Sequence, residues 1–138
     1  MQIVHVDETA SLARFQPYLT QVLKASKIVP GVSGTAVVES RILEATDLLM
    51  VSPDVATTDE VRLLVADMVV QGRAGRVVLL NGNRKDPEAE QVVRANGALV
   101  ESKGQKPRPL AVAIRDHLKV VNERELKAAA QAREPSGC

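Results

Sequence analysis

Several polar side chains that could do chemistry follow short apolar runs in this sequence. They are Asp7, Glu8, Ser52, Asp54, Asn81 and Lys103. The carboxylates of Asp7, Glu8 and Asp54 could bind a hard cation such as Mg²⁺, although two or three oxygens of this kind bind it only weakly. Acids after a strand are also common as solvated loop residues without a ligand. Both interpretations stay open at this point.

The sequence lacks the motifs that would favour an enzyme. It has no Gly-x-Ser-x-Gly elbow, and the segment NGNRK from Asn81 lacks the spacing of a Walker or dinucleotide-binding loop. Cys138 is the single cysteine and stands last, and neither His5 nor His117 has a second ligand at metal-binding spacing. We therefore expect no enzymatic activity. We interpret His5 as a packed strand residue and His117 as a solvated one.

The apolar pattern alternates between short and long stretches along the chain. Short runs rich in Val, Ile and Leu predict five strands, at residues 3–6, 27–32, 47–52, 77–80 and 98–100. Amphipathic stretches predict five helices, at residues 10–25, 35–45, from 58 to the glycine at 72, 88–95, and from 110 to about 134. This alternation predicts an α/β fold in which one five-stranded parallel sheet lies between two layers of helices.

Local signals refine the ends of these helices. Pro17 predicts a kink in the first helix or a start near that residue. Thr58 is the expected N-cap of the third helix, and Asn96-Gly97 predicts a left-handed stop after the fourth. A polar loop is expected at residues 101–109. Since sites in such a sheet lie at the carboxyl ends of the strands, we expect the six polar side chains to meet at that edge.

These strand-end residues resemble, in type at some positions and in spacing at all of them, the pocket of response-regulator receiver domains. Asp7 and Glu8 stand where the family has its Mg²⁺-binding acids. We expect no cofactor, although these two acids could still bind Mg²⁺ weakly. Ser52 lies 45 residues after Asp7, at the position of the phosphate-accepting aspartate. Asn81 and Lys103 follow Ser52 by 29 and 51 residues, near the family's hydroxyl and lysine. The resemblance covers about residues 2–121 and implies a (βα)5 flavodoxin-like, three-layer sandwich.

The departures from the receiver pattern fall on the reactive positions. Ser52 replaces the carboxylate nucleophile, and a serine hydroxyl without an adjacent base cannot do that chemistry. Asn81 replaces the hydroxyl that follows the phosphate, and Val100 replaces the Tyr or Phe of the fifth strand. Lys103 is followed by Gly104 instead of the family's proline. The resemblance therefore implies a degenerate member, a pseudo-receiver that works without phosphorylation.

The resemblance also implies a role in two-component signal transduction as a regulatory protein–protein interaction module. In receiver domains the fourth helix, fifth strand and fifth helix form the usual partner surface, so we expect a protein partner or a homodimer there. The candidate surface residues are Arg94, Leu110, Ile114, His117, Leu118 and Val121. Residues 1–121 would form the domain, and residues 122–138 a helical connector and tail, as in the N-terminal part of a larger regulator.

Charge and length exclude several other classes. Eighteen Lys and Arg against 17 Asp and Glu leave a net charge of +1, which argues against nucleic-acid binding and against an anionic membrane surface. The basic excess lies in the last helix. No targeting segment and no apolar run of membrane-spanning length is found in the sequence, so we expect a cytoplasmic protein.

Two other functions are compatible with the same residues. One is a small-ligand or cation-binding domain, or an enzyme, of the same topology that uses Asp7, Glu8, Asp54 and Asn81 around a cation or a phosphate. The other is a receiver that still responds to phosphate through Asp54, although that carboxylate stands two residues beyond the acceptor position.

Overall fold

A computed structural model describes residues 1–31 and 33–133. Five parallel strands form one sheet in the order β2-β1-β3-β4-β5. They are β1 (Gln2–Val6), β2 (Lys27–Gly31), β3 (Leu48–Val51), β4 (Val77–Asn81) and β5 (Leu99–Ser102). The predicted fold class, a five-stranded parallel α/β sandwich, is confirmed.

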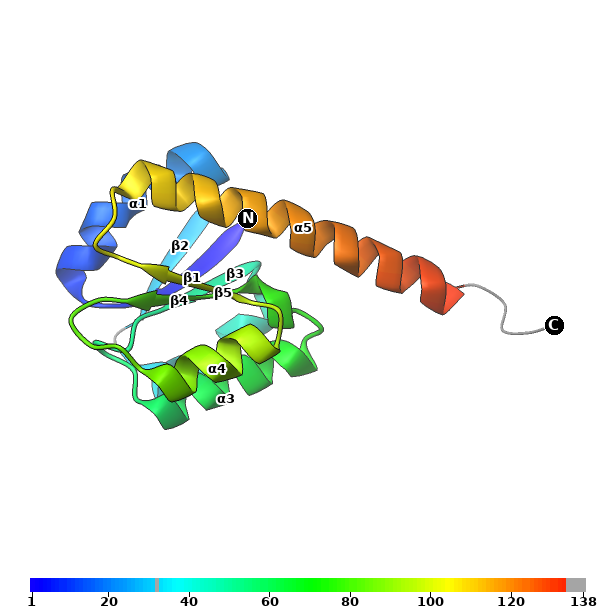
Figure 1. The fold of residues 1–138 in the computed structure, drawn as a ribbon, viewed down its shortest axis with the longest axis horizontal. Helices are drawn as coiled ribbons and strands as arrows, with labels where there is room; N and C mark the ends of the chain where they lie inside the picture. The colour runs from blue at the N-terminus through cyan, green and yellow to red at the C-terminus, as the bar shows by residue number, and fades with distance from the viewer. Residues whose placement is uncertain (32, 134–138) are drawn as a thin grey trace.

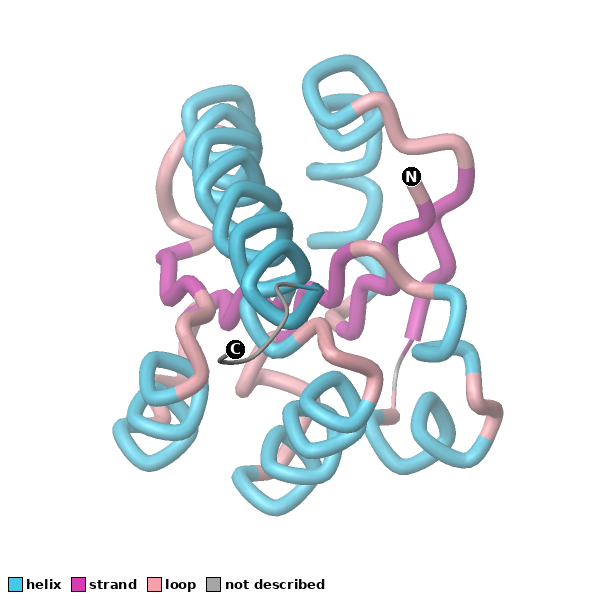
Figure 2. The backbone as a smooth tube through the Cα atoms, turned by 90° about the vertical axis from the view of Figure 1, so that its right-hand side faces the viewer, coloured by secondary structure: helices cyan, strands magenta, loops and turns pink. Residues whose placement is uncertain are grey.

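Helices cover both faces of this sheet, as Figures 1 and 2 show. One layer holds α1 (Thr9–Leu23) and α5 (Pro107–Arg133), and the other holds α2 (Gly34–Glu39), α3 (Thr58–Val70) and α4 (Pro87–Ala95). Two 3-10 turns, η1 (Ile42–Ala45) and η2 (Ala74–Arg76), precede β3 and β4. The architecture is therefore a three-layer sandwich.

The two central strands β3 and β4 explain why the core forms on both faces. All four residues of β3 and all five of β4 are buried. Their side chains alternate: Leu48 and Met50 pack with α1 and α5, whereas Leu49 and Val51 pack with α2, α3 and α4. A continuous apolar run therefore fits a strand that is covered on both sides.

The helix predicted at residues 35–45 is wrong in its second half. Helix α2 ends at Glu39, and Arg41 takes a left-handed conformation with φ 58° before η1 begins. A non-glycine residue in that region cannot continue a right-handed helix. The amphipathic pattern persisted across this break because Val37 and Leu43 are both buried against the same face of the sheet.

Three helix starts also differ from the expectation. Helix α1 begins at Thr9 and runs unbroken through Pro17 to Leu23, so it does not start near the proline. The N-cap of α3 is Thr57 and not Thr58, because Thr57 and Glu60 form a capping box. Helix α5 begins at Pro107, inside the segment predicted as a loop, since proline suits a first helical turn.

Helix α5 continues beyond the body of the domain as one uninterrupted helix (Figure 1). Val121 is its last buried residue, and from Asn122 to Ala132 only Glu125 is partly buried. Arg76 contacts this segment through hydrogen bonds to Asn122 and Glu125. The domain boundary after residue 121 stays a prediction, and residues 134–138 of the predicted tail lie outside the described part.

Within the described residues, no helix has both the length and the apolar character needed to cross a membrane.

Candidate functional site

The carboxyl edge of the sheet brings together most of the polar residues that the sequence singled out. Asp7 and Ser52 directly follow β1 and β3, Asn81 ends β4, and Lys103 follows β5. Two backbone hydrogen bonds continue the strand pairing at this edge, from Ser52 N to Val6 O at 3.0 Å and from Lys103 N to Asn81 O at 2.9 Å. The edge is therefore a well-ordered set of strand ends in which these side chains are fixed by the sheet.

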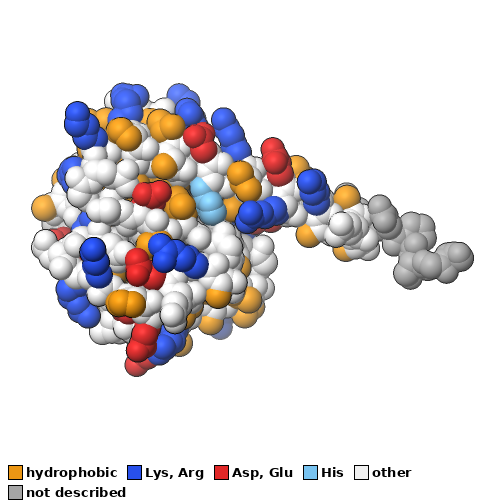
Figure 3. Space-filling view, in the orientation of Figure 1, with side chains coloured by type: hydrophobic (Ala, Val, Ile, Leu, Met, Phe, Trp, Pro, Cys, Tyr) orange, Lys and Arg blue, Asp and Glu red, His pale blue; other side chains and the backbone are white. Residues whose placement is uncertain are grey.

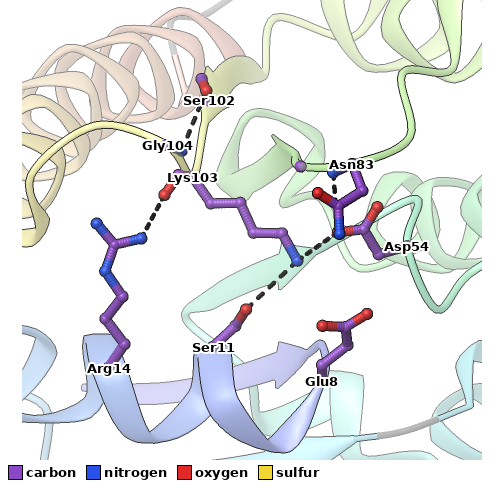
Figure 4. Close-up of a pocket in the computed structure, with 9 residues that line it drawn as sticks. Glu8, Ser11, Arg14, Asp54, Asn83, Ser102, Lys103 and Gly104 are labelled. Atoms are coloured by element: carbon purple, nitrogen blue, oxygen red, sulfur yellow. Dashed lines mark hydrogen bonds and ion pairs between the residues drawn. The ribbon is translucent and has the colours of Figure 1, made fainter.

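Lys103 lies at the centre of the site, between two carboxylates. Its Nζ is 2.7 Å from Asp7 Oδ1. The same atom lies 2.7 Å from Asp54 Oδ2 and 3.4 Å from Ser11 Oγ (Figure 4). The side chains of Asp7 and Lys103 are 0% and 9% exposed. This ion triad is largely out of water, so its charges interact much more strongly than surface pairs do. Lys103 thus lies at the carboxyl edge of the sheet with Asp7, and its match to the receiver lysine stays a prediction.

Asp54 also reaches this corner, although its position in the sequence is two residues past the strand-end Ser52. Its Oδ1 accepts the backbone N–H of Arg84 at 2.8 Å, and its Oδ2 accepts that of Asn83 at 3.3 Å. Its side chain is 4% exposed. Both carboxylate oxygens are thus engaged by donors from the segments after β4 and β5.

Ser52 and Asn81 are buried and engaged in local structure. Ser52 is 0% exposed, and its Oγ accepts the backbone N–H of Asp54 at 3.2 Å, which starts the turn after β3. The Nδ2 of Asn81 donates to Glu90 Oε1 of α4 at 2.8 Å. Val100 is half-buried and packs against the core on the α3 and α4 side. All three positions have structural contacts, while Asn81 Oδ1 stays buried without a hydrogen-bond partner.

His5 is buried behind the site, on β1. Its ring is 0% exposed, lies 6.2 Å from the Phe15 ring, and places Nε2 3.3 Å from Asp7 Oδ2 without hydrogen-bond alignment. The interpretation of His5 as a packed strand residue is confirmed, but the ring also lies against the buried acid. The sequence held a signal for this contact: His5 and Asp7 are two residues apart along a strand, and side chains at i and i+2 lie on the same face.

Glu8 and Arg14 lie at the rim of the same pocket. The pocket has a volume of about 300 Å³ and is lined from α1, from the turn after β4 and from the segment after β5. Glu8 is exposed, and Arg14 donates to the backbone carbonyls of Lys103 at 2.6 Å and Gln105 at 3.0 Å. The sequence analysis missed Arg14 because its partners lie about 90 residues away and are backbone atoms.

The residues of the pocket do not fit an Mg²⁺ ion in the observed arrangement. Mg²⁺ requires near-octahedral oxygen ligands, but Lys103 already contacts both Asp7 and Asp54. Glu8 alone keeps an unengaged carboxylate, and Asp7 Oδ2 is buried next to His5. No group of three or more metal-ligating side chains occurs among residues 1–31 and 33–133.

The pKa values of the triad follow from burial opposed by pairing. Burial alone would raise the pKa of Asp7, but the neighbouring His5 ring and the Lys103 ammonium outweigh it, so the pKa lies below its usual range. Burial would also raise the pKa of Asp54, but the hydrogen bonds from Lys103 and from the backbone N–H of Arg84 outweigh it and lower this pKa. The two carboxylates in turn raise the pKa of Lys103 against the effect of burial. All three groups are therefore charged at neutral pH.

These shifts predict the pH dependence of stability. A carboxylate whose pKa is lowered by folding stabilises the fold above its unfolded value of about 3.9 and loses that contribution as the pH falls further. A lysine whose pKa is raised loses its contribution only above about pH 10.4. We expect the difference in unfolding free energy between the wild type and Asp54→Asn to be constant between pH 5 and 9 and to shrink below pH 4. Urea unfolding at each pH measures it, and a difference that persists unchanged to pH 2.5 would contradict the ion-triad assignment.

Gly82 provides a second prediction because it lies against the triad. A Cβ at this position would overlap Lys103 Cε and Asp54 Oδ2, whereas at Gly104, in the same pocket, it would lie 3.4 Å from Ser102 Oγ. We expect Gly82→Ala to cost about 1–3 kcal/mol, as overpacking typically does, and Gly104→Ala to cost less. Equal urea midpoints for the two variants would be the contrary result.

The predicted interaction surface needs a correction. Leu110, Ile114, Leu118 and Val121 are at most 4% exposed. The first three pack with the sheet and α1, and Val121 lies beside Gly75 of η2. These four residues cannot meet a partner. Of the other two, Arg94 is exposed.

His117 is not solvated as predicted. It is half-buried, and its Nε2 lies 2.8 Å from the carbonyl oxygen of Gly75. The exposed side of α5 is instead formed by Arg115, Asp116 and Val120. Charged side chains of both signs are spread over the visible face of the domain and along the projecting helix (Figure 3). No single-sign patch dominates that face.

Comparison with known proteins identifies the fold. No protein-family model and no curated protein sequence matches the chain. Among solved structures, the signal receiver domain of a protein assigned as the Luxo repressor of Vibrio parahaemolyticus is 14% identical, with a TM-score of 0.67, and the match covers 91% of this chain and 95% of that one. The BeF3-activated DrrB receiver domain is 19% identical, with a TM-score of 0.62 and coverage of 86% and 97%.

A third similar structure is a protein assigned as the pilus assembly protein cpaE of Burkholderia thailandensis. It is 15% identical, with a TM-score of 0.62, and the match covers 86% of this chain and 97% of that one. At these identities the similarity establishes the fold. The resemblance to receiver domains drawn from the spacing of strand-end residues is thereby confirmed at the level of the fold.

Proposed function

We propose, from the receiver fold of this chain, that it is a regulatory interaction module that works without phosphorylation and without Mg²⁺. The observation that carries the proposal is the Asp7–Lys103–Asp54 triad, in which the chain's own ammonium pairs with both buried carboxylates. The site is filled by internal contacts. It therefore has a stable arrangement that needs no added phosphoryl group or cation.

The chemistry of the acceptor position supports the same role. Ser52 is fully buried, its Oγ accepts a hydrogen bond from the turn that it begins, and no base contacts it. Asp54, the other candidate acceptor, has both oxygens engaged by Lys103 and two backbone amides. An acceptor must also be reachable by the phosphorus atom. Ser52 is 0% exposed and the Asp54 side chain 4%, so neither is presented to a phosphoryl donor in this arrangement.

A direct test uses a small phosphoryl donor on the full chain. We expect incubation with acetyl phosphate or beryllofluoride and Mg²⁺ to leave the backbone amide resonances of Ser52 and Asn81 unshifted, and intact-mass analysis to show no added phosphoryl group. A phosphorylatable receiver domain treated in parallel is the positive control. Saturable shifts around Ser52, Asp54 or Asn81 would exclude the phosphorylation-independent role.

For the partner surface we retain α4, β5 and α5, restricted to their exposed side chains. Val120 is 44% exposed on α5 and lies beyond the buried stripe, and Arg94 is exposed on α4. The proposed occupant is a protein partner or a second copy of the chain. If the occupant is a second copy, Val120→Glu should abolish the self-association that light scattering detects. Val70→Glu is the matched control, because Val70 lies on α3 and is 81% exposed. Loss of self-association in Val70→Glu alone would move the surface to α3.

A second candidate function is a small-ligand or cation-binding domain at the same edge. It is favoured by the pocket of about 300 Å³ and by the exposed Glu8 carboxylate at its rim. The discriminating measurement is a Mg²⁺ titration of the wild type and of Glu8→Gln by amide chemical shifts. Millimolar binding that Glu8→Gln abolishes would favour this candidate over a metal-independent module.

A further inference from the structure

A three-residue turn at the amino edge of the sheet contacts α5 where that helix leaves the core. The turn is η2, which directly precedes β4. The carbonyl oxygen of Gly75 in this turn accepts a hydrogen bond from His117 Nε2 at 2.8 Å. The Gly75 backbone also lies against Val121, because a Cβ at position 75 would come within 3.1 Å of that side chain. The contact between η2 and α5 therefore begins in the buried part of the helix.

Arg76, the last residue of η2, extends this contact beyond the core. Its Nε and Nη2 donate to the two carboxylate oxygens of Glu125 at 3.1 and 2.8 Å, and Nη2 also donates to Asn122 Oδ1. The Arg76 side chain is 15% exposed, and its Nη1 donates to the carbonyl oxygen of Asp47 at 3.4 Å. A bidentate pair of arginine and carboxylate has one defined geometry. Arg76 thus joins the starts of β3 and β4 to the turn of α5 that follows Val121.

The segment of α5 past Val121 has few other contacts with the domain. Residues 122–132 are exposed except for Glu125, and the helix nonetheless continues to Arg133 (Figure 1). Short helices without tertiary contacts are only marginally stable in water, and chain ends fray first. Among the described residues, Glu125 is the last of α5 to hydrogen-bond the rest of the domain. The pair of Arg76 and Glu125 therefore decides where fraying begins.

We infer that η2 is a clamp that fixes the direction of the projecting part of α5, and that Arg76 is its positioning residue. With the Arg76 contacts in place, residues 122–126 move as part of the domain. Without them, the helix is anchored only as far as Val121, and the segment beyond frays or swings. The consequence for function rests on the proposed function: an interaction module with this clamp displays the exposed Leu126 in one orientation relative to the sheet.

Removing the Arg76 contacts should loosen the projecting segment while the domain stays folded. A hydrogen bond to a charged group corresponds to roughly 10- to 100-fold in an opening equilibrium, and the partial exposure of Glu125 weakens this pair. The amides of residues 126–129 bond to the carbonyls of residues 122–125. We expect these amides to exchange about 5- to 10-fold faster in Arg76→Met. The backbone order parameters of residues 122–126 should fall from about 0.85 toward the flexible range below about 0.6.

The experiment compares hydrogen exchange and backbone NMR relaxation of the full chain in the wild type and three single variants, Arg76→Met, Arg73→Met and Glu125→Gln. Arg73 lies at the same edge and donates to the carbonyls of Glu44 and Thr46, but its side-chain hydrogen bonds do not reach α5. Arg73→Met should therefore leave residues 122–129 as in the wild type. Glu125→Gln keeps the size and helix propensity and loses the charge, so it should loosen the segment in part. The double variant Arg76→Met/Glu125→Gln should loosen it no more than Arg76→Met alone.

The outcomes separate the clamp from the proposed function. Unchanged exchange and order parameters at residues 122–129 in Arg76→Met overturn the clamp. Equal loosening in Arg73→Met also overturns it, because the effect would then be a general loss of stability at the amino edge. If Arg76→Met does not fold, a Glu125→Gln profile identical to that of the wild type is the contrary result. Phosphoryl transfer to the wild-type protein would instead remove the proposed function and leave the contacts of Arg76 as they are.

Discussion

Lys103→Met is expected to destabilise the protein by about 3–5 kcal/mol at pH 7, the range found when one partner of a buried ion pair is removed. Lys103 is 8% exposed, and its ammonium lies 2.7 Å from both Asp7 Oδ1 and Asp54 Oδ2. Methionine retains much of the aliphatic volume but leaves two carboxylates in a buried corner without a cation. Urea unfolding measures the change, because the midpoint and the slope of the unfolding free energy against urea concentration together give the free energy of unfolding in water.

Two further variants show whether this loss comes from charge. Lys127→Met changes an exposed lysine of the projecting segment and should alter the unfolding free energy by less than about 0.5 kcal/mol. Asp7→Asn combined with Lys103→Met removes the fully buried carboxylate as well, and should recover part of the loss because groups in one network are not additive. If Lys103→Met were as mild as Lys127→Met, the buried triad would have no role in stability.

The sheet and the positions of its strand ends could be predicted from the sequence because both depend on local pattern. The runs at β3 and β4 are apolar at nearly every residue, which requires cover on both faces and fixes them as central strands. Parallel strands then end at one edge, so Asp7, Ser52 and Lys103 had to be close in space. The spacing between these residues follows from the order and length of the strands and helices between them.

What could not be predicted is which side chains touch within that edge. Asp54 follows Ser52 by two residues, and only the path of the turn after β3 brings its carboxylate to Lys103 and the amides after β4. Arg14 binds two carbonyls of the segment after β5, and backbone acceptors leave no trace in the residue pattern. Such contacts depend on loop geometry that no spacing rule gives.

The stripe on α5 shows a different kind of error. Leu110, Ile114, Leu118 and Val121 recur at helical spacing, which indicates one apolar face but does not say what covers it. The sheet and α1 cover the first three of these residues, and Val121 lies beside Gly75 of η2. A periodic apolar face beside a sheet is first of all a core face, and a partner surface has to be sought among the remaining exposed side chains.

Ser52→Asp restores the acidic side chain of the receiver pattern, and we expect it to destabilise this protein by at least about 3 kcal/mol relative to Ser52→Asn at pH 7.5. Position 52 is 0% exposed, and one lysine already serves the two carboxylates of Asp7 and Asp54. A third buried carboxylate would have no cation, and an unpaired buried charge is far more costly than a neutral amide of the same size. Urea unfolding of the two variants isolates the charge from the added volume.

The stability difference between Ser52→Asp and Ser52→Asn should depend on pH in a direction that identifies the buried charge as its cause. Burial near two like charges raises the pKa of a carboxyl group, so the aspartate at position 52 would take up a proton on folding. Stability then increases as the pH falls from 7.5 toward 5, where the unfolded chain still ionises this group. We expect the gap between Ser52→Asp and Ser52→Asn to narrow over that interval. If the two variants are equally stable at pH 7.5, position 52 tolerates a third carboxylate beside Lys103, and the triad no longer supports the phosphorylation-independent role.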